Sequence, residues 1–242
     1  MSALPAAEKA IYPLSYAARL AGLDEMTARR WIYGYDYKHK GETRQSAPVI
    51  QMIPSNARDR SDLTFEELLT LRLVRAFREE AKLGLQTIKA AARVASTKYN
   101  VGNPFITKAF RSDGRKVFLE LQNRNEVRGE QRVLVEAMSG QQQFREVVEP
   151  SLFRNVVFIG DEPTEWRPKG MKRSVVIRPD RAFGAPHIEG TGVRTDVIYD
   201  AVVAEGKNRE AITAVAEWFG ITKLKIIQAV AAEVEWRTPR KS

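Results

Sequence analysis

The chain has 242 residues, 43% of them hydrophobic and 29% charged, which is enough for one or two compact units with sizeable cores. It contains no cysteine and two histidines, which excludes disulfides, thiol nucleophiles and zinc sites built on cysteine and histidine. No apolar run approaches the roughly 18 residues that a membrane span needs, and residues 1–13 lack the apolar segment of a secretory signal. We therefore expect a cytoplasmic protein that needs no metal, nucleotide or other cofactor.

The net charge of +9 is typical of proteins that bind nucleic acids. The excess is unevenly spread, since residues 72–124 carry 12 Lys and Arg against 4 Asp and Glu, whereas residues 125–171 carry 6 against 8. On charge alone, a basic protein without a polyanionic partner is the alternative.

Residues 12–33 predict two short helices joined by a tight turn. In the first helix, Ala17 and Ala18 are small enough for a second helix to cross closely. Gly22 suits the left-handed residue that ends a helix, and Asp24 is a good N-cap for the next one. The pattern indicates a helix-turn-helix, in which the second helix enters the major groove of DNA.

The second helix carries Thr27, Arg29 and Arg30, which cannot all face the core and would contact base edges or phosphates. An alanine-containing first helix, a glycine turn and a Thr-x-Arg-x-Trp second helix resemble the N-terminal helix-turn-helix of MerR-type regulators. This resemblance covers about 20 residues and implies binding of double-stranded DNA. The alternative is a helical hairpin whose arginines are simply solvated.

Residues 33–53 predict a β-hairpin that starts with Tyr35 and Tyr37, turns at Gly41–Glu42 and returns through an apolar run at residues 49–53. In a MerR-like domain this hairpin takes the place of the wing. Its basic side chains would then bind DNA phosphates, which set the register; they are Lys38, His39, Lys40 and Arg44. An ordinary hairpin with solvated basic side chains is the alternative.

The middle of the chain predicts helices and one further hairpin. Helices are expected from Thr64 to about residue 82 and over residues 85–99. Asp113–Gly114 lies between two apolar runs and therefore predicts a hairpin turn. A polar segment with a helix ending at Pro150 follows, then a strand at residues 156–159 and a turn-rich stretch.

Residues 175–236 predict a short strand, a loop rich in glycine and proline, and three helices at about residues 195–205, 208–218 and 222–236. This order resembles the bacterial domain of unknown function 433, which occurs in antitoxins. The residues that carry the resemblance are Pro179, Gly184, Pro186, Ile188, Gly190 and Thr191. Gly192 and Arg194 depart from that pattern. A MerR-like motif followed by such a domain resembles VapB-type antitoxins, whose partners are PIN-domain ribonuclease toxins.

Three aromatic residues near the C-terminus are candidates for contacts with a protein partner. Trp218, Phe219 and Trp236 follow or end apolar helical stripes, and a unit of about 60 residues buries only part of its surface. An aromatic side chain left out of the core would anchor a partner. The third helix adds an apolar stripe to the trihelical domain; its members are Leu224, Ile227, Ala231 and Val234.

These features predict a mainly α-helical α+β chain with small β-hairpins. We expect a winged helix-turn-helix-like region at residues 1–124, a connecting segment at 125–171 and a trihelical C-terminal domain with a β arm at 172–242. The chain would be a non-enzymatic regulator that binds double-stranded DNA as a homodimer, with two recognition helices in successive major grooves. The resemblance to VapB-type antitoxins implies that it represses its own operon and neutralises a PIN-domain toxin.

Two alternatives stay open. One is a stand-alone or phage-derived transcription factor without a toxin. The other is an enzyme acting on nucleic acid, in which Asp196 and Asp200 at i, i+4 spacing would hold a metal, although such a pair usually marks a solvated helix face. His187 beside Glu189 could form an acid–base pair, but a hydrogen bond within the loop explains the histidine better.

Overall fold

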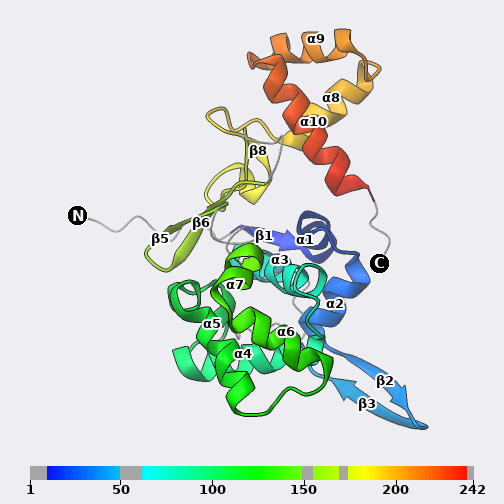
Figure 1. Cartoon of the computed structure of the whole chain (residues 1–242). Coiled ribbons are helices and arrows are strands. Elements are labelled where there is room, and N and C mark those ends of the chain that lie inside the picture. The colour runs from blue at the N-terminus through cyan, green and yellow to red at the C-terminus, as the bar shows by residue number, and fades with distance from the viewer. Residues whose placement is uncertain (1–9, 50–61, 149–154, 169–173, 239–242) are drawn as a thin grey trace, which may run out of the picture.

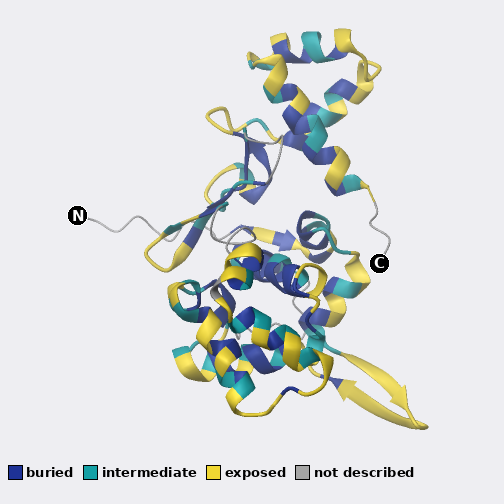
Figure 2. Ribbon diagram, viewed as in Figure 1, coloured by how far each residue is buried: buried dark blue, intermediate teal, exposed yellow. Residues whose placement is uncertain are grey.

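The computed structural model describes residues 10–49, 62–148, 155–168 and 174–238. This part of the chain is mainly helical, with four small two-stranded antiparallel sheets, which confirms the predicted fold class. Figure 1 shows a helical N-terminal unit, a β-rich arm and a helical C-terminal unit. Residues classed as buried occur in all three parts (Figure 2). No described helix is long and apolar enough to cross a membrane.

The two short helices predicted at the N-terminus are confirmed. α1 (Leu14–Ala21) ends at Gly22, whose φ of 74° lies in the left-handed region. α2 (Glu25–Tyr33) follows Asp24, whose side chain accepts a hydrogen bond from the Thr27 backbone N–H at 2.8 Å. Two local signals, a glycine stop and an aspartate cap, therefore set the turn of the motif.

The sheet and helices behind the motif pack directly against it. β1 (Ile11–Pro13) pairs antiparallel with β4 (Asp62–Thr64). α3 (Phe65–Glu79) begins with a capping box, in which Thr64 and Glu67 each bond the other's backbone N–H. α3 packs against α1. The next helix, α4 (Leu85–Tyr99), begins and ends at the residues that the sequence predicts.

The predicted hairpin is present, but its second strand is not the expected one. β2 (Tyr35–His39) pairs with β3 (Glu42–Ser46) across a two-residue turn, Lys40–Gly41, in which both residues have positive φ. The short turn pairs Tyr35 with Ser46, so the ladder ends before the apolar run begins. Val49 of that run packs into the core, and residues 50–53 lie outside the described part of the chain.

The hairpin predicted at Asp113–Gly114 is wrong, because both residues lie within α5 (Lys108–Asn123). The flanking apolar residues follow helical rather than strand spacing and are buried; they are Phe110, Val117, Phe118 and Leu121. The glycine serves close packing, since a Cβ on Gly114 would lie 2.8 Å from Cζ of Phe144. Tertiary packing therefore outweighs the local Asp-Gly turn signal.

Residues expected to connect two domains instead contribute helices to the N-terminal unit. η1 (Pro104–Ile106) leads into α5, and α6 (Glu130–Ser139) packs against α5. α7 (Gln141–Val148) packs against α6 and α3. Val135, Met138 and Val148 are buried in the same hydrophobic core as α3.

The β-rich arm consists of the short strands between residues 156 and 188, which lead from the N-terminal unit to the C-terminal helices. β5 (Val156–Ile159) confirms the predicted strand, and β6 (Glu162–Trp166) occupies part of the stretch expected to be turns. β7 (Val175–Val176) pairs with β8 (His187–Ile188). Trp166 and Ile177 exchange backbone hydrogen bonds of 2.9 Å, which continue the arm into the C-terminal unit.

The three C-terminal helices are confirmed as α8 (Thr195–Ala204), α9 (Arg209–Phe219) and α10 (Lys223–Arg237). α10 packs against α8 and α9 and touches α1. The short turn η3 (Ala182–Gly184) reaches back to the N-terminal unit, where the Tyr12 hydroxyl donates a buried hydrogen bond to the Gly184 carbonyl at 3.0 Å. The two units are thus joined by specific contacts as well as by the chain.

Candidate nucleic-acid interface

α2 has one face in the core and one face in solvent. Ala28, Trp31 and Ile32 are buried, while Arg29 and Arg30 are exposed. Thr27 is half-buried near the start of the helix, where its N–H binds Asp24. Hydrogen bonds from Thr27, first from its side chain and then from its backbone, lower the pKa of Asp24 below its ordinary value. The cap therefore keeps a negative charge at the N-terminus of the helix.

The two arginines of α2 are oriented by different neighbours. Arg29 forms an ion pair with Glu25 at 3.2 Å, on the preceding turn of the helix. The guanidinium of Arg30 lies 5.4 Å from the centre of the Tyr35 ring on β2, and among the described residues it makes no ion pair. Arg30 is thus held where α2 meets the hairpin, with its N–H donors available to a ligand.

The β2–β3 hairpin projects from the N-terminal unit, and all of its side chains before Ser46 are exposed (Figure 2). Lys38 and Lys40 stand at its tip, and Arg44 forms an exposed ion pair with Glu42 at 3.4 Å. The Tyr35 and Tyr37 rings lie 6.0 Å apart on the same strand. An exposed basic hairpin beside the solvent face of α2 has the layout of a DNA-binding wing.

Because a two-stranded hairpin without a core of its own is marginally stable, the root of this one must be attached to the protein. Gly34 joins α2 to β2 with φ 75°, and a Cβ at this position would lie 2.3 Å from the Ser46 carbonyl oxygen. The Val49 N–H donates to the Trp31 carbonyl at 2.7 Å, and Lys89 Nζ donates to Ser46 Oγ at 2.9 Å. Gly34 directly follows the predicted second helix, which is the sequence signal that points to it, whereas no local pattern marks Lys89.

The structure places the three candidate partner-binding aromatics in different environments. Trp218 is 60% exposed at the end of α9, Phe219 is half-buried against the core, and Trp236 is only 7% exposed. Trp236 therefore belongs to the interior of this chain, and of these three aromatic residues Trp218 is the one whose side chain is mostly exposed.

α10 is rotated relative to the expected packing. Its buried face contains Ile226, Ala229 and Trp236. The apolar stripe that the sequence predicts for this helix faces outward, with Leu224 62%, Ile227 40% and Val234 48% exposed. The sequence predicts one apolar stripe on this helix, but the contacts with α8 and α9 cover a different face of it.

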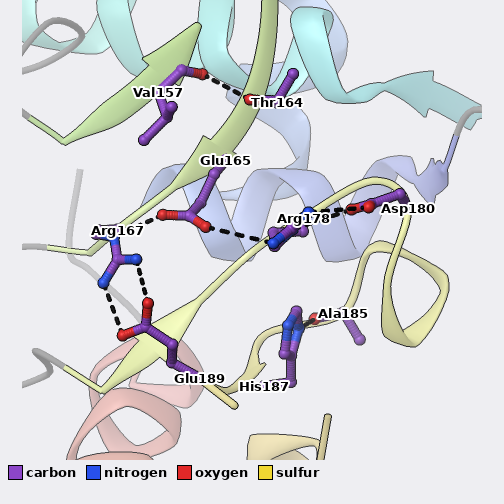
Figure 3. Close-up of polar contacts among 9 residues, drawn as sticks. All are labelled: Val157, Thr164, Glu165, Arg167, Arg178, Asp180, Ala185, His187 and Glu189. Carbon is purple, nitrogen blue, oxygen red and sulfur yellow. Dashed lines mark hydrogen bonds and ion pairs between the residues drawn. The ribbon is translucent and has the colours of Figure 1, made fainter. Parts of the chain in front are cut away.

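Glu189, the carboxylate considered as a partner of His187, is engaged in an ion pair with Arg167 (Figure 3). Arg167 binds Glu165 at 2.6 Å and also Glu189, while His187 Nδ1 lies 2.9 Å from the Ala185 carbonyl oxygen. His187 therefore makes the expected hydrogen bond within its loop, and Glu189 pairs with arginine.

The acidic pair of α8 is also engaged. Asp196 pairs with Arg194, and Asp200 lies 3.0 Å from Arg237. No group of three or more potential metal ligands occurs among the described residues.

Comparison with known proteins identifies a helix-turn-helix domain in the N-terminal part of the chain. Residues 10–92, from β1 into α4, match a family model described as "Putative DNA-binding HTH domain". The chain is 27% identical over 237 residues to "Putative antitoxin VapB45" of Mycobacterium tuberculosis, covering 92% of this chain and 93% of that protein. It shares its fold with the crystal structure of Rv2018 from Mycobacterium tuberculosis, at a TM-score of 0.68 and 23% identity over 90% of this chain and 96% of the other. The chain thus has an N-terminal helix-turn-helix domain of a DNA-binding type and a distant similarity to an antitoxin.

Proposed function

We propose that the protein is a sequence-specific transcriptional regulator that inserts α2 into the major groove and holds the flanking backbone with the β2–β3 wing. The observation that carries the proposal is the solvent face of α2, where Arg29 and Arg30 stand beside an exposed basic hairpin within the helix-turn-helix domain. Arginine suits this role because its planar guanidinium forms paired hydrogen bonds with the O6 and N7 atoms of guanine.

The residues divide into two roles on this proposal. Arg30 and Arg29 read base edges or clamp phosphates next to them, and Thr27 contacts the backbone at the start of the helix. Lys38, Lys40 and Arg44 bind phosphates along the wing, which adds affinity and sets the register without reading sequence. Binding as a homodimer to two half-sites about 34 Å apart would make the protein a repressor of the promoter it covers.

The test is a comparison of two double variants that each remove two positive charges. An operator is first selected from random duplexes with the full-length protein. Arg29→Ala with Arg30→Ala should then weaken operator binding by about ten- to a hundredfold, as expected for loss of a base-reading contact. Lys108→Ala with Arg115→Ala, two exposed residues of α5, is the control and should change affinity only slightly. Equal losses of operator affinity in both variants would show that only the net charge matters, and they would refute base reading by α2.

The second part of the proposal is that the protein acts as the antitoxin of a PIN-domain ribonuclease and represses their shared operon. The distant similarity to "Putative antitoxin VapB45" supports it, and so does the C-terminal unit, which exposes Trp218 together with the outer stripe of α10. Large apolar side chains on a surface are typical of anchors at protein interfaces.

This part is tested by co-expression with a PIN-domain ribonuclease encoded beside the gene. The full-length protein should co-purify with that enzyme and relieve its toxicity. Trp218→Ser with Leu224→Ser should abolish both effects, whereas Ile159→Ser, at a 73% exposed apolar residue of β5, should retain them. A gene neighbourhood without such a ribonuclease would favour the alternative, a stand-alone transcription factor.

A further inference from the structure

A cleft of about 320 Å³ lies between the root of the β2–β3 hairpin and α4. β3 and the residues after it form one wall, α4 forms another, and Pro104 and Phe105 of η1 contribute apolar surface. Its size is at the lower end for sites that hold small molecules. The cleft therefore touches both the body of the DNA-binding domain and the part of the wing that α2 and α4 hold in place.

The chemistry of the cleft is that of an anion site. α4 contributes Gln86, Lys89, Arg93 and Ser96, whose spacing of three, four and three residues puts them on one helical face. All four side chains carry hydrogen-bond donors, and two of them are cations. Among the described residues, no Asp or Glu lines the cleft. The positive charges are thus not balanced within its walls.

Lys89 is the central cation. Its ammonium group donates one hydrogen bond, to Ser46 Oγ at 2.9 Å, and among the described residues it has no carboxylate within ion-pair distance. Burial lowers the pKa of Lys89 below its ordinary value, because the charged form loses solvation. Arg93 lies 3.5 Å from Glu126 in an ion pair, and its side chain is 71% exposed. An oxyanion between these two groups would supply the missing counter-charge.

We propose that this cleft binds a phosphate group, carried either by a small phosphorylated effector or by the DNA backbone next to the wing. A phosphate offers several acceptor oxygens in a tetrahedral arrangement, which matches donors that come from α4 and from the hairpin root. Because Lys89 also holds Ser46 of β3, an occupant bound to Lys89 changes how firmly the wing is attached to the domain. Phosphate binding would therefore control the wing and, through it, the affinity for DNA; this last step rests on the proposed function.

Two measurements on the full-length protein separate the two sources of phosphate. Inorganic phosphate is titrated calorimetrically against a sodium chloride control of equal ionic strength. DNA affinity is measured over a series of salt concentrations. The variants are Lys89→Gln, the charge-preserving Lys89→Arg, and Lys108→Gln as a control that removes one exposed charge from α5.

A free phosphate ligand predicts saturable binding that Lys89→Gln weakens by about tenfold or more and that Lys89→Arg largely preserves. A backbone phosphate predicts instead that Lys89→Gln reduces the salt slope of DNA binding by about one, with no effect from Lys108→Gln. Either result supports the site. The proposal is overturned if Lys89→Gln, shown by circular dichroism to be folded, matches the wild type in both measurements. The phosphate titration needs no DNA, so a failure of DNA binding itself remains distinguishable.

Discussion

Replacing Gly34 by alanine should displace the β2–β3 hairpin relative to α2, the helix proposed to read DNA. Gly34 has φ 75° and ψ −173°, a conformation that is essentially restricted to glycine. A Cβ at this position would lie 2.3 Å from the Ser46 carbonyl oxygen and 3.2 Å from the Pro48 nitrogen, and both are backbone atoms. No side-chain rotation can relieve these contacts, so the start of β2 or the end of β3 must move.

The expected cost has two sources. Holding alanine in this backbone conformation costs about 1–3 kcal/mol, and forcing an extra carbon against close-packed atoms adds about 1–3 kcal/mol. Gly41→Ala is the matched control, because Gly41 also has positive φ (85°) but a Cβ there would meet no atom within 4 Å. Gly41→Ala should therefore lose only the stability that corresponds to backbone strain, about 1–2 kcal/mol.

Urea unfolding followed by circular dichroism compares the stability of the two variants, and fluorescence anisotropy with the selected operator compares their DNA affinity. Gly34→Ala should lose at least about 1 kcal/mol more stability than Gly41→Ala, the share assigned to the steric contacts. It should also bind DNA about tenfold more weakly, because wing and α2 no longer reach the same duplex in register. Equal stability losses in the two variants would refute the steric reasoning, and wild-type DNA affinity in Gly34→Ala would refute the role of the wing.

Three further predictions concern stability. Gly114→Ala should destabilise the fold by about 1–2 kcal/mol, because overpacking against Phe144 outweighs the gain of about 1 kcal/mol in helix propensity; a rise in the midpoint of thermal unfolding would contradict this. Tyr12→Phe should cost about 1–3 kcal/mol in urea unfolding, since it leaves the buried Gly184 carbonyl without its hydrogen bond; a value near zero would show that the contact between the units contributes nothing. Asp24→Asn keeps an acceptor at the helix cap but removes its charge. The folded protein holds the pKa of Asp24 below its ordinary value, so this charge stabilises the fold at neutral pH, and the benefit disappears as the pH falls below about 4. The stability difference between wild type and Asp24→Asn should therefore shrink on acidification, and a constant difference would argue against the charged cap.

The elements that could be predicted correctly are those whose signals lie within a few neighbouring residues. Gly22 and Asp24 define the turn of the helix-turn-helix, and the capping box at Thr64 starts α3 where it was predicted. Each of these features satisfies backbone groups at a helix end with a partner at most five residues away, so no knowledge of the fold is needed. The candidate DNA-binding side chains on α2 could also be named from the local sequence. The amphipathic pattern of a helix shows which of its positions lie outside the core.

Tertiary structure decided the features that depend on residues far apart in the chain. Asp113–Gly114 is helical because α7 brings Phe144 against the glycine, and a local turn signal contains no information about that ring. α10 carries two apolar stripes, and only its packing against α8 and α9 determines that Leu224 stays in solvent. The cleft beside the wing has the same origin, since Lys89 and Ser46 are 43 residues apart and meet only when α4 packs beside the hairpin. Local hydrogen bonds can be inferred from the order of residues, whereas the burial of a side chain depends on which distant surface covers it.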